Sequence, residues 1–298
     1  MQFKKLELTD AEALKTFFLL YPQRTRMCDH TVGTPLLWRN YFNSRFAIEG
    51  DSLFFMAEIG TEKEIAFCVT AYKNKREAFE KIKEYCKKEN IPPAFCFTPK
   101  EDIDVIGEVF GDIEVLSARD WFDYLYNARD LIHFSGNRYH GQKNHLNRFK
   151  KLYPEYSFNE ITPAEIPLIK AFFEEYIKTH TKDSASWREE TDRIFELLDN
   201  YSLFPVCGGS ISAEGKIIAF SVGEKMGDTL FIHVEKALTR YSGSYQVMVN
   251  EFAKFFVSEE IVYINREDDM GDEGLRRSKL SYHPVQLIEK HFIRIRGQ

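Results

Sequence analysis

The stretch from Thr229 to Tyr282 constrains the fold more than any other part of the chain, because its hydrophobic pattern changes period along its length. From Thr229 to Ala237, apolar and polar side chains alternate, which is typical of a β-strand with one buried face. From Ser244 to Ser258, large apolar side chains recur at three- and four-residue steps, which predicts an amphipathic helix of about four turns. We therefore predict a strand, a loop, a helix, a further strand at 261–264 and a short helix.

The loop between this strand and this helix is a candidate anion-binding site. Ser242 and Gly243 are both suitable helix caps. The first N–H groups of a helix have no partner within the helix, and the positive end of the helix dipole lies there. A helix start of this kind binds phosphate or carboxylate groups.

The rest of the chain indicates a second unit of similar layout. At 298 residues the chain is long for one core, and two domains of roughly 130 to 150 residues are expected. Each half contains strands and helices in the same order, which predicts an α+β protein with a mixed, mostly antiparallel sheet flanked by helices in each domain. We expect an N-terminal domain at 1–130, a basic linker helix at 131–154 and a C-terminal domain at 155–298.

Composition argues against several classes of protein. The net charge of -6 disfavours a chain whose whole surface coats nucleic acid or anionic membrane. The five cysteines are scattered without a CxxC pair, so neither a disulfide framework nor a metal site is indicated. Cys28 and His30 lack the partners of a nucleophile or a metal ligand, and we interpret them as loop residues. Without an export signal or a bilayer-spanning apolar stretch, we expect a soluble cytoplasmic protein with no stable membrane insertion.

The segment from Leu131 to Pro154 has the strongest local charge bias. It contains no acidic residue. Its basic side chains are Arg138, Lys143, Arg148, Lys150 and Lys151, with three histidines among them. As a helix, this segment either presents a basic flank to a nucleotide phosphate or an RNA backbone, or is a solvated linker whose bases pair with acidic neighbours.

A short motif and several longer segments carry a family resemblance. RYSGSY, beginning at Arg240, resembles the R/Q-x-x-G-x-G/A signature of the GNAT superfamily of N-acetyltransferases. The whole chain resembles an uncharacterised bacterial family grouped with the C-terminal domain of phosphatidylglycerol lysyltransferase. The segments behind this resemblance are CDHTVGTPLLWRNYF from Cys28, DYLYNARDLIHFSGNRYHGQKNHLNRF from Asp123, FIHVEKA and INREDDMGDEGLRRSKLSYHP. The resemblance implies two tandem GNAT-like domains, of which the N-terminal one is degenerate because it lacks an RxxGxG-like loop.

The resemblance also implies where an acyl donor binds. In GNAT enzymes the strand before the signature loop binds the pantetheine arm of coenzyme A through its backbone, which corresponds here to Val234 and Lys236. The loop amides bind the pyrophosphate, which corresponds to Arg240, Tyr241, Ser242, Gly243, Ser244 and Tyr245. Tyr245 departs from the signature, which has a small residue at that position.

The identity of the donor stays open. The lysyltransferase domain and its Fem-type relatives have GNAT-like folds but take an aminoacyl group from transfer RNA. Both acyl-CoA, as a co-substrate rather than a permanently bound cofactor, and aminoacyl-tRNA are therefore candidate donors.

Three side chains are candidates for the chemistry. Glu235 is either a general base that deprotonates an attacking amine or a surface carboxylate paired with Lys236 or a loop arginine. His233, two residues away on the same strand face, either shares that task or is packed and hydrogen-bonded. Tyr282 follows the last helix, where GNAT enzymes often place a tyrosine that protonates the leaving thiolate, and the alternative is packing in the core.

The polar loop after the strand at 261–264 is a candidate substrate-binding segment. We predict that Asn265 bonds the donor and that Arg266, Glu267 and Asp268 bind the substrate, with the carboxylates holding a cationic amine and with Arg266 and Glu267 facing inward. The spacing of its acidic residues does not match a calcium-binding loop. The alternative is a solvated turn with helix-capping aspartates.

Together these residues predict an acyltransferase whose working site lies in the C-terminal domain. It would transfer an acetyl or aminoacyl group from CoA or aminoacyl-tRNA to an amine or hydroxyl acceptor, such as a small-molecule or peptide amine. The alternative is a non-catalytic ligand-binding or scaffold protein that retains the GNAT-like fold.

Overall fold

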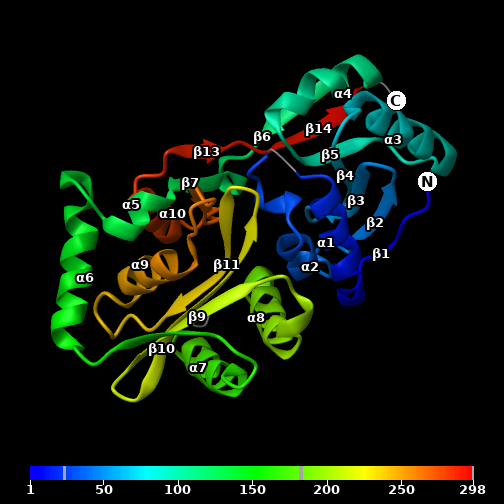
Figure 1. The fold of residues 1–298 in the computed structure, drawn as a ribbon. Coiled ribbons are helices and arrows are strands. Elements are labelled where there is room, and N and C mark those ends of the chain that lie inside the picture. The colour runs from blue at the N-terminus through cyan, green and yellow to red at the C-terminus, as the bar shows by residue number, and fades with distance from the viewer. Residues whose placement is uncertain (23–24, 181–183, 297–298) are drawn as a thin grey trace. The chain divides into compact units, whose positions relative to one another are not determined.

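The computed structural model describes residues 1–22, 25–180 and 184–296, and the chain divides into two α+β units (Figure 1). Unit 1 comprises Met1–Asp123, Asp268–Asp272 and Ile288–Gln298, and unit 2 comprises Tyr124–Glu267 and Glu273–Leu287. Each unit contains a seven-stranded sheet in which most neighbouring strands are antiparallel. The predicted α+β class is confirmed.

The division differs from the linear one expected from the sequence. Residues 131–154 belong to unit 2 and do not link two domains, and the last strand, β14 (His291–Ile295), belongs to unit 1. β14 pairs with β5 (Ala94–Thr98) on one side and with β6 (Ile113–Ser117) on the other. Hydrogen bonding to neighbours decides the place of a strand in a sheet, and the order of elements along the chain does not reveal those neighbours.

Unit 1 has the strand order β1-β2-β3-β4-β5-β14-β6, in which β4 and β5 form a parallel pair. Its other strands are β1 (Lys4–Lys5), β2 (Arg45–Glu49), β3 (Ser52–Ile59) and β4 (Glu64–Ala71). Its helices are α1 (Ala11–Leu20), α2 (Gly33–Trp38), α3 (Lys75–Glu89) and α4 (Ile103–Phe110), with 3-10 turns η1 (Leu8–Asp10), η2 (Cys28–His30), η3 (Lys100–Asp102) and η4 (Arg119–Trp121).

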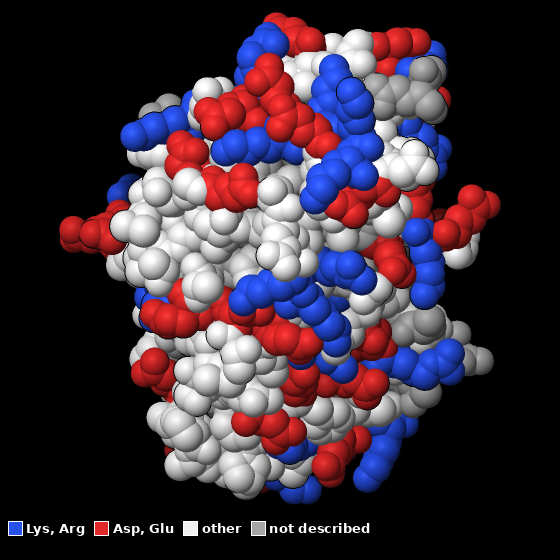
Figure 2. All heavy atoms as spheres, turned by 90° about the vertical axis from the view of Figure 1, so that its right-hand side faces the viewer, with Lys and Arg blue, Asp and Glu red and all other residues white. Residues whose placement is uncertain are grey.

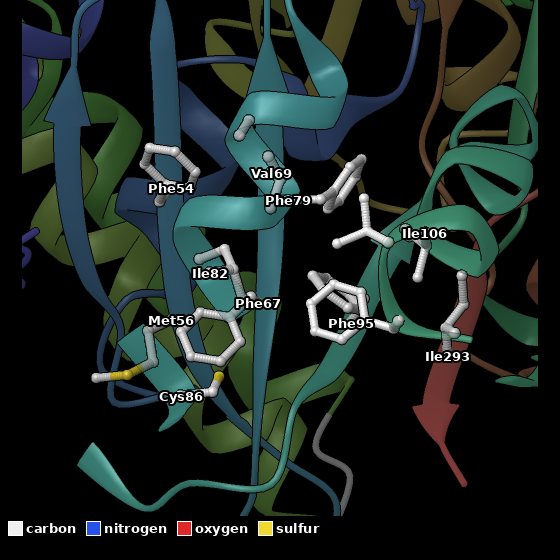
Figure 3. Packing of buried hydrophobic residues seen from close by; sticks show 13 residues of the cluster. Phe54, Met56, Phe67, Val69, Phe79, Ile82, Cys86, Phe95, Ile106 and Ile293 are labelled. Carbon is white, nitrogen blue, oxygen red and sulfur yellow. The ribbon is translucent and has the colours of Figure 1, made fainter. Parts of the chain in front are cut away.

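The core of unit 1 lies between one face of its sheet and helices α3 and α4 (Figure 3). Residues two apart on β3 and β4 form the sheet side, and residues three and four apart on α3 form the helix side. The side chains labelled in Figure 3 are Phe54, Met56, Phe67, Val69, Phe79, Ile82, Cys86, Phe95, Ile106 and Ile293. Burial of each large apolar side chain contributes about 1.5–3 kcal/mol.

Unit 2 has the strand order β13-β7-β12-β11-β10-β9-β8. Its strands are β7 (Asp123–Asn127), β8 (Ser157–Glu160), β9 (Cys207–Ala213), β10 (Lys216–Met226), β11 (Thr229–Ala237), β12 (Tyr263–Asn265) and β13 (Gln286–Ile288). Its helices are α5 (Ala128–His133), α6 (His140–Leu152), α7 (Ile166–Thr179), α8 (Ala185–Asp199), α9 (Ser244–Phe256) and α10 (Glu273–Leu280), with 3-10 turns η5 (Asn137–Tyr139) and η6 (Tyr201–Leu203).

Helices cover both faces of the sheet of unit 2. Five consecutive residues of β10, from Ile218 to Val222, are fully buried, and consecutive strand residues point to opposite faces. On one face, Phe220 packs against Phe172 and Phe173 of α7. Helix α9 covers the other face, as Figure 1 shows. The predicted strand at 229–237 is confirmed, and so is the predicted helix start, because α9 begins at Ser244 after Gly243.

Two further properties concern the distribution of charge and the character of the helices. Lysine and arginine side chains lie interspersed with aspartate and glutamate on the face shown in Figure 2. Within residues 1–22, 25–180 and 184–296, no helix combines the length and the apolar character needed to cross a membrane.

Candidate functional site

The pairing of β11 with β12 ends part-way along β11. The two strands are parallel, and they pair only where residues 229–231 face residues 263–265. β11 continues to Ala237 along β10, so its residues 232–237 have no β12 residue in register with them. We call this place, where β11 and β12 separate, the sheet split.

An ion pair between Arg266 and Glu235 lies at the sheet split. Arg266 directly follows the last paired residue of β12. Its Nη2 donates to Oε1 of Glu235 at 2.7 Å, and the two side chains are 8% and 12% exposed. Burial lowers the pKa of the Arg266 guanidinium, but the charge of Glu235 outweighs this effect and raises the pKa above its usual value. Arg266 is therefore charged, and Glu235 has the loop arginine as its partner.

The surroundings of Arg266 hold it in place. Its Cζ lies 4.7 Å from the ring centroid of Tyr282 and 5.8 Å from that of Tyr126. Its backbone N–H donates to the carbonyl of Tyr124 at 3.0 Å, and its carbonyl accepts from Nζ of Lys279 at 2.5 Å. Nη1 is buried and has no hydrogen-bond partner among the described residues. A buried donor without a partner costs about 1–3 kcal/mol.

Tyr282 lies in the same buried region. Its side chain is 1% exposed, and its carbonyl accepts from the hydroxyl of Tyr139 at 3.0 Å. Burial raises the pKa of Tyr282 above its usual value, and the charge of Arg266 opposes this rise. Gln246 is close enough to influence that pKa, but within the described part of the chain no group meets the Tyr282 hydroxyl with hydrogen-bond geometry. The hydroxyl therefore keeps its proton near pH 7.

His233 connects two carboxylates. Its Nδ1 lies 2.8 Å from Oε1 of Glu267, and its Nε2 lies 3.2 Å from Oε2 of Glu224 on β10. Burial lowers the pKa of His233, but the hydrogen bonds to Glu224 and Glu267 outweigh this effect and raise it to about 9. The ring is thus an imidazolium at neutral pH, with both N–H groups engaged. A ring in this state has no lone pair to accept a proton, which agrees with the packed and hydrogen-bonded alternative.

Comparison with known proteins identifies the family. Residues 23–294 match the family model described as phosphatidylglycerol lysyltransferase, C-terminal. The chain belongs to this lysyltransferase C-terminal family. A conserved protein of unknown function from Bacteroides thetaiotaomicron has a crystal structure that is similar over 99% of this chain and 100% of that one, with 28% identity and a TM-score of 0.91.

Two further relatives of this lysyltransferase C-terminal family member are more distant. The structure of L-PGS from Bacillus licheniformis is similar over 99% of this chain and 95% of that one, with 14% identity and a TM-score of 0.68. An uncharacterised protein of Mycoplasmoides gallisepticum is 24% identical over 190 residues, and this match spans 62% of this chain and 59% of that protein. The likeness to L-PGS extends over both units of this chain and shows a shared fold.

In this family member, the GNAT signature loop is packed within unit 2. A Cβ added at Gly243 would lie 2.5 Å from the carbonyl oxygen of His145 in α6. The Ser244 N–H donates to the carbonyl of Tyr241 at 2.9 Å, and the Ser244 hydroxyl donates to the carbonyl of Leu238 at 3.0 Å. The Ser244 amide is thus used within the protein, which differs from the outward-facing amide that a pyrophosphate site requires.

Other side chains of the loop contact α7. Arg240 pairs with Glu175 at 2.6 Å at the surface. The hydroxyl of Tyr245 lies 3.5 Å from that of Tyr176, so the Tyr245 ring points toward α7. Ser242 is half-buried. The structure thus brings the predicted loop residues together, with several of their polar groups already bonded.

Three other predicted donor-binding residues also have protein partners. The Val234 carbonyl accepts from the hydroxyl of Ser221 at 2.9 Å, so this carbonyl faces β10 and not the sheet split. Nζ of Lys236 lies 2.7 Å from a glutamate of α8. Oδ1 of Asn265 accepts from the N–H of Glu267 at 2.7 Å, so this side chain shapes its own turn.

The acidic loop is divided between the two units. Arg266 and Glu267 point inward in unit 2, whereas Asp268 is grouped with unit 1. Oδ1 of Asp268 accepts from the N–H of Met270 at 3.1 Å. This is the turn-capping bond of the alternative interpretation.

The basic segment 131–154 forms helices α5 and α6, which pack on α9. Nδ2 of Asn250 in α9 donates to the carbonyl of Leu131 at 2.9 Å. Lys150 pairs with Glu251 of α9 at 3.1 Å. The exposed side chains of α6 include His140, Lys143, Arg148 and Lys151. Arg138 likewise pairs with Asp130 at 2.8 Å, so two of the five bases have partners within unit 2, and Lys143, Arg148 and Lys151 lie at the surface.

Unit 1 contains a charged cluster that sequence reasoning missed. Nζ of Lys290 lies 2.6 Å from Asp29, 2.8 Å from Asp123 and 3.2 Å from the sulfur of Cys28. Burial lowers the pKa of Lys290, but Asp123 and Asp29 raise it well above its usual value. Cys28, Asp29 and Asp123 offer ligand atoms within 4.8 Å of one another, but the ammonium already supplies the positive charge there. Cys28 and Lys290 are 262 residues apart, so no local pattern links them.

Proposed function

We propose that unit 2 is a GNAT-like transferase that moves an acyl or aminoacyl group from an ester or thioester donor to an amine or hydroxyl acceptor. The observation that supports this most directly is the Arg266–Glu235 ion pair at the sheet split, with the ring of Tyr282 against the guanidinium. A fixed positive charge, a carboxylate and a protonated phenol in one buried place are the groups that acyl transfer uses. Membership of the lysyltransferase family agrees with this assignment.

In this proposal Glu235 takes the proton of the acceptor. An amine attacks a carbonyl carbon only in its neutral form, so a nearby carboxylate must accept a proton during the reaction. The Glu235 side chain is 12% exposed, which leaves it accessible to an incoming amine. General-base assistance of this kind contributes about 10²- to 10⁴-fold to a rate.

We favour an aminoacyl ester carried by tRNA over acyl-CoA. The pyrophosphate of CoA requires free amides at the signature loop, but the Ser244 amide is bonded to Tyr241 and Gly243 is packed on α6. Tyr245 adds a large ring at the same helix start. The exposed bases of α6 offer a separate surface for RNA phosphates.

The test is protein-dependent release of the acyl group from two donors, with ethanolamine as an acceptor that carries both an amine and a hydroxyl. Acetyl-CoA is followed by its free thiol, and bulk tRNA charged with radiolabelled amino acids is followed by acid-precipitable label. We expect the charged tRNA to lose its label faster than in the protein-free control. Glu235→Gln should lower this rate about 10²-fold or more, because it removes the proton acceptor.

Glu251→Gln is the matched control for this test. It removes a partly buried carboxylate that pairs with Lys150 outside the sheet split, so its rate should equal that of the wild type. If neither donor is consumed above the protein-free rate, the transferase assignment is wrong.

A non-catalytic binding protein is the second candidate, and the packed signature loop is the observation that favours it. Such a protein binds uncharged tRNA or CoA but does not consume aminoacyl-tRNA or acetyl-CoA. In that case Glu235→Gln changes neither the binding affinity nor the absence of turnover. Calorimetric titration with uncharged tRNA and with CoA, together with the donor assay, separates the two candidates.

A further inference from the structure

Two buried donors of the sheet split have no partner among the described residues: Nη1 of Arg266 and the hydroxyl of Tyr282. Their side chains are 8% and 1% exposed, so water at the surface does not satisfy them. We propose that these two groups form the oxyanion site of the transferase and donate to the acyl carbonyl oxygen as it becomes negative. This inference rests on the transfer reaction proposed above and names the atoms that stabilise its charged intermediate.

The charge balance of the site favours a transient anion over a permanent one. The positive charge of Arg266 is already matched by Glu235 at 2.7 Å. A bound phosphate or carboxylate would therefore add a net negative charge in a buried place, which is costly. The carbonyl oxygen of the acyl donor is neutral when that substrate binds. It gains negative charge only during attack, when the two hydrogen-bond donors stabilise it.

The two donors are also held in position. The Arg266 backbone is bonded to Tyr124 on one side and to Lys279 on the other, and the carbonyl of Lys279 accepts from the Tyr126 hydroxyl at 2.8 Å. The Tyr282 ring lies against the guanidinium. Donors that are fixed before the reaction need no reorganisation when charge develops, and this is the main advantage of an oxyanion site.

The acceptor nitrogen attacks the carbonyl carbon, the C–N bond forms, and the π electron pair moves to the oxygen, which accepts from Arg266 and Tyr282. Glu235 takes the ammonium proton. The electron pair then returns, the bond from carbon to the leaving oxygen or sulfur breaks, and the leaving group takes the proton from Glu235. Tyr282 keeps its proton throughout, in contrast to the leaving-group protonation that the family resemblance implies.

The experiment compares Tyr282→Phe, Arg266→Lys and the double variant with the wild type, with charged tRNA as donor and ethanolamine as acceptor. Tyr282→Phe keeps the ring and removes only the hydroxyl, and Arg266→Lys keeps a positive charge for Glu235 but lacks the second nitrogen. Each change should lower kcat about 10²-fold, with KM for the donor unchanged, because the contact exists only in the transition state. The double variant should lose less than the product of the two single losses, because the donors act as a unit.

Tyr156→Phe is the control, because the Tyr156 hydroxyl lies elsewhere in unit 2, where it donates to Glu251 at 2.9 Å. It should match the wild-type rate. A purely structural role of Tyr282 would raise KM and lower the melting temperature instead. If Arg266→Lys does not fold, Tyr282→Phe alone carries the test.

The outcomes separate this inference from the proposed function. If the wild type consumes charged tRNA and the rate of Tyr282→Phe is within about threefold of the wild-type rate, the proposed oxyanion site is wrong, but the proposed transferase function is not. If the wild type consumes neither charged tRNA nor acetyl-CoA, the transferase assignment fails and the oxyanion site fails with it.

Discussion

Each unit buries a charged network, but the two networks differ in how fully the protein satisfies them. In unit 1 the Lys290 ammonium has three acceptors, from Asp29, Asp123 and Cys28, which equals its number of N–H groups. In unit 2 the Arg266 guanidinium bonds Glu235 through one terminal nitrogen, and the other has no partner among the described residues. A complete network stabilises a fold, whereas an incomplete one suits a ligand. We therefore assign the chemistry to unit 2.

The largest expected effect tests the complete network. Lys290→Met removes the cation and leaves two carboxylates without it, Asp123 at 0% and Asp29 at 12% exposure, which should cost unit 1 about 3–5 kcal/mol. Hydrogen exchange read on peptides of β3 and β4 measures this loss within unit 1. The matched change Arg266→Met should cost unit 2 less, because it leaves only Glu235, which is 12% exposed and open to hydration, whereas Lys290→Met also leaves Asp123, which is 0% exposed. Equal losses in both units would contradict the distinction between the networks.

The next effect concerns pH, to which a histidine in each unit responds with opposite sign. The pKa of His233 is raised from 6.5 to about 9, so its contribution to unit 2 is complete below pH 6.5 and is lost as pH rises toward 9. Burial, together with the charges of Lys290 and Lys75, lowers the pKa of His30 to about 3. Its contribution to unit 1 is therefore complete above pH 6.5 and is lost as pH falls toward 3.

Urea titrations at pH 5, 7 and 9 measure these changes, which should be on the order of 2 kcal/mol. His233→Gln should remove the loss at high pH, and His30→Gln should remove the loss at low pH. Variants that keep the wild-type pH dependence would show that these histidines are not its source.

The smallest expected effect compares two glycines of unit 2. Gly243 and Gly215 both have positive φ, at 91° and 75°, where a side chain is strained. An added Cβ at Gly243 also meets the His145 carbonyl at 2.5 Å, whereas one at Gly215 meets nothing within 4 Å. Gly243→Ala should therefore destabilise the protein by about 1 kcal/mol more than Gly215→Ala, measured by thermal unfolding. Equal losses would mean that the signature loop is free to move away from α6.

Local patterns predicted the elements of unit 2 well. The alternation over 229–237 and the apolar stripe beginning near Ser244 correspond to β11 and α9. The division of the chain into two units was not predictable from local patterns. β14, near the C-terminus, lies in the sheet of unit 1, and β7, from the first half of the chain, lies in the sheet of unit 2.

The sequence predicted most residues of the candidate site but not which of them contact one another. Glu235, Arg266, Glu267 and Tyr282 were all named from the sequence, and the structure places them at or near the sheet split. Glu224, which bonds His233, carries no signal that distinguishes it from other strand glutamates. Lys279 likewise resembles any basic residue of a short helix, although it holds the carbonyl of Arg266.

The sequence by itself determined the strands, the helices and the family of this protein, because periodicity and motifs are properties of neighbouring residues. The tertiary structure alone decided that Glu235 meets Arg266, that His233 bridges two carboxylates and that Lys290 pairs with Asp29 and Asp123 from far earlier in the chain. Hydrogen bonds and ion pairs act over about 3 Å, and positions far apart along a chain come that close only when the strands that carry them are assembled.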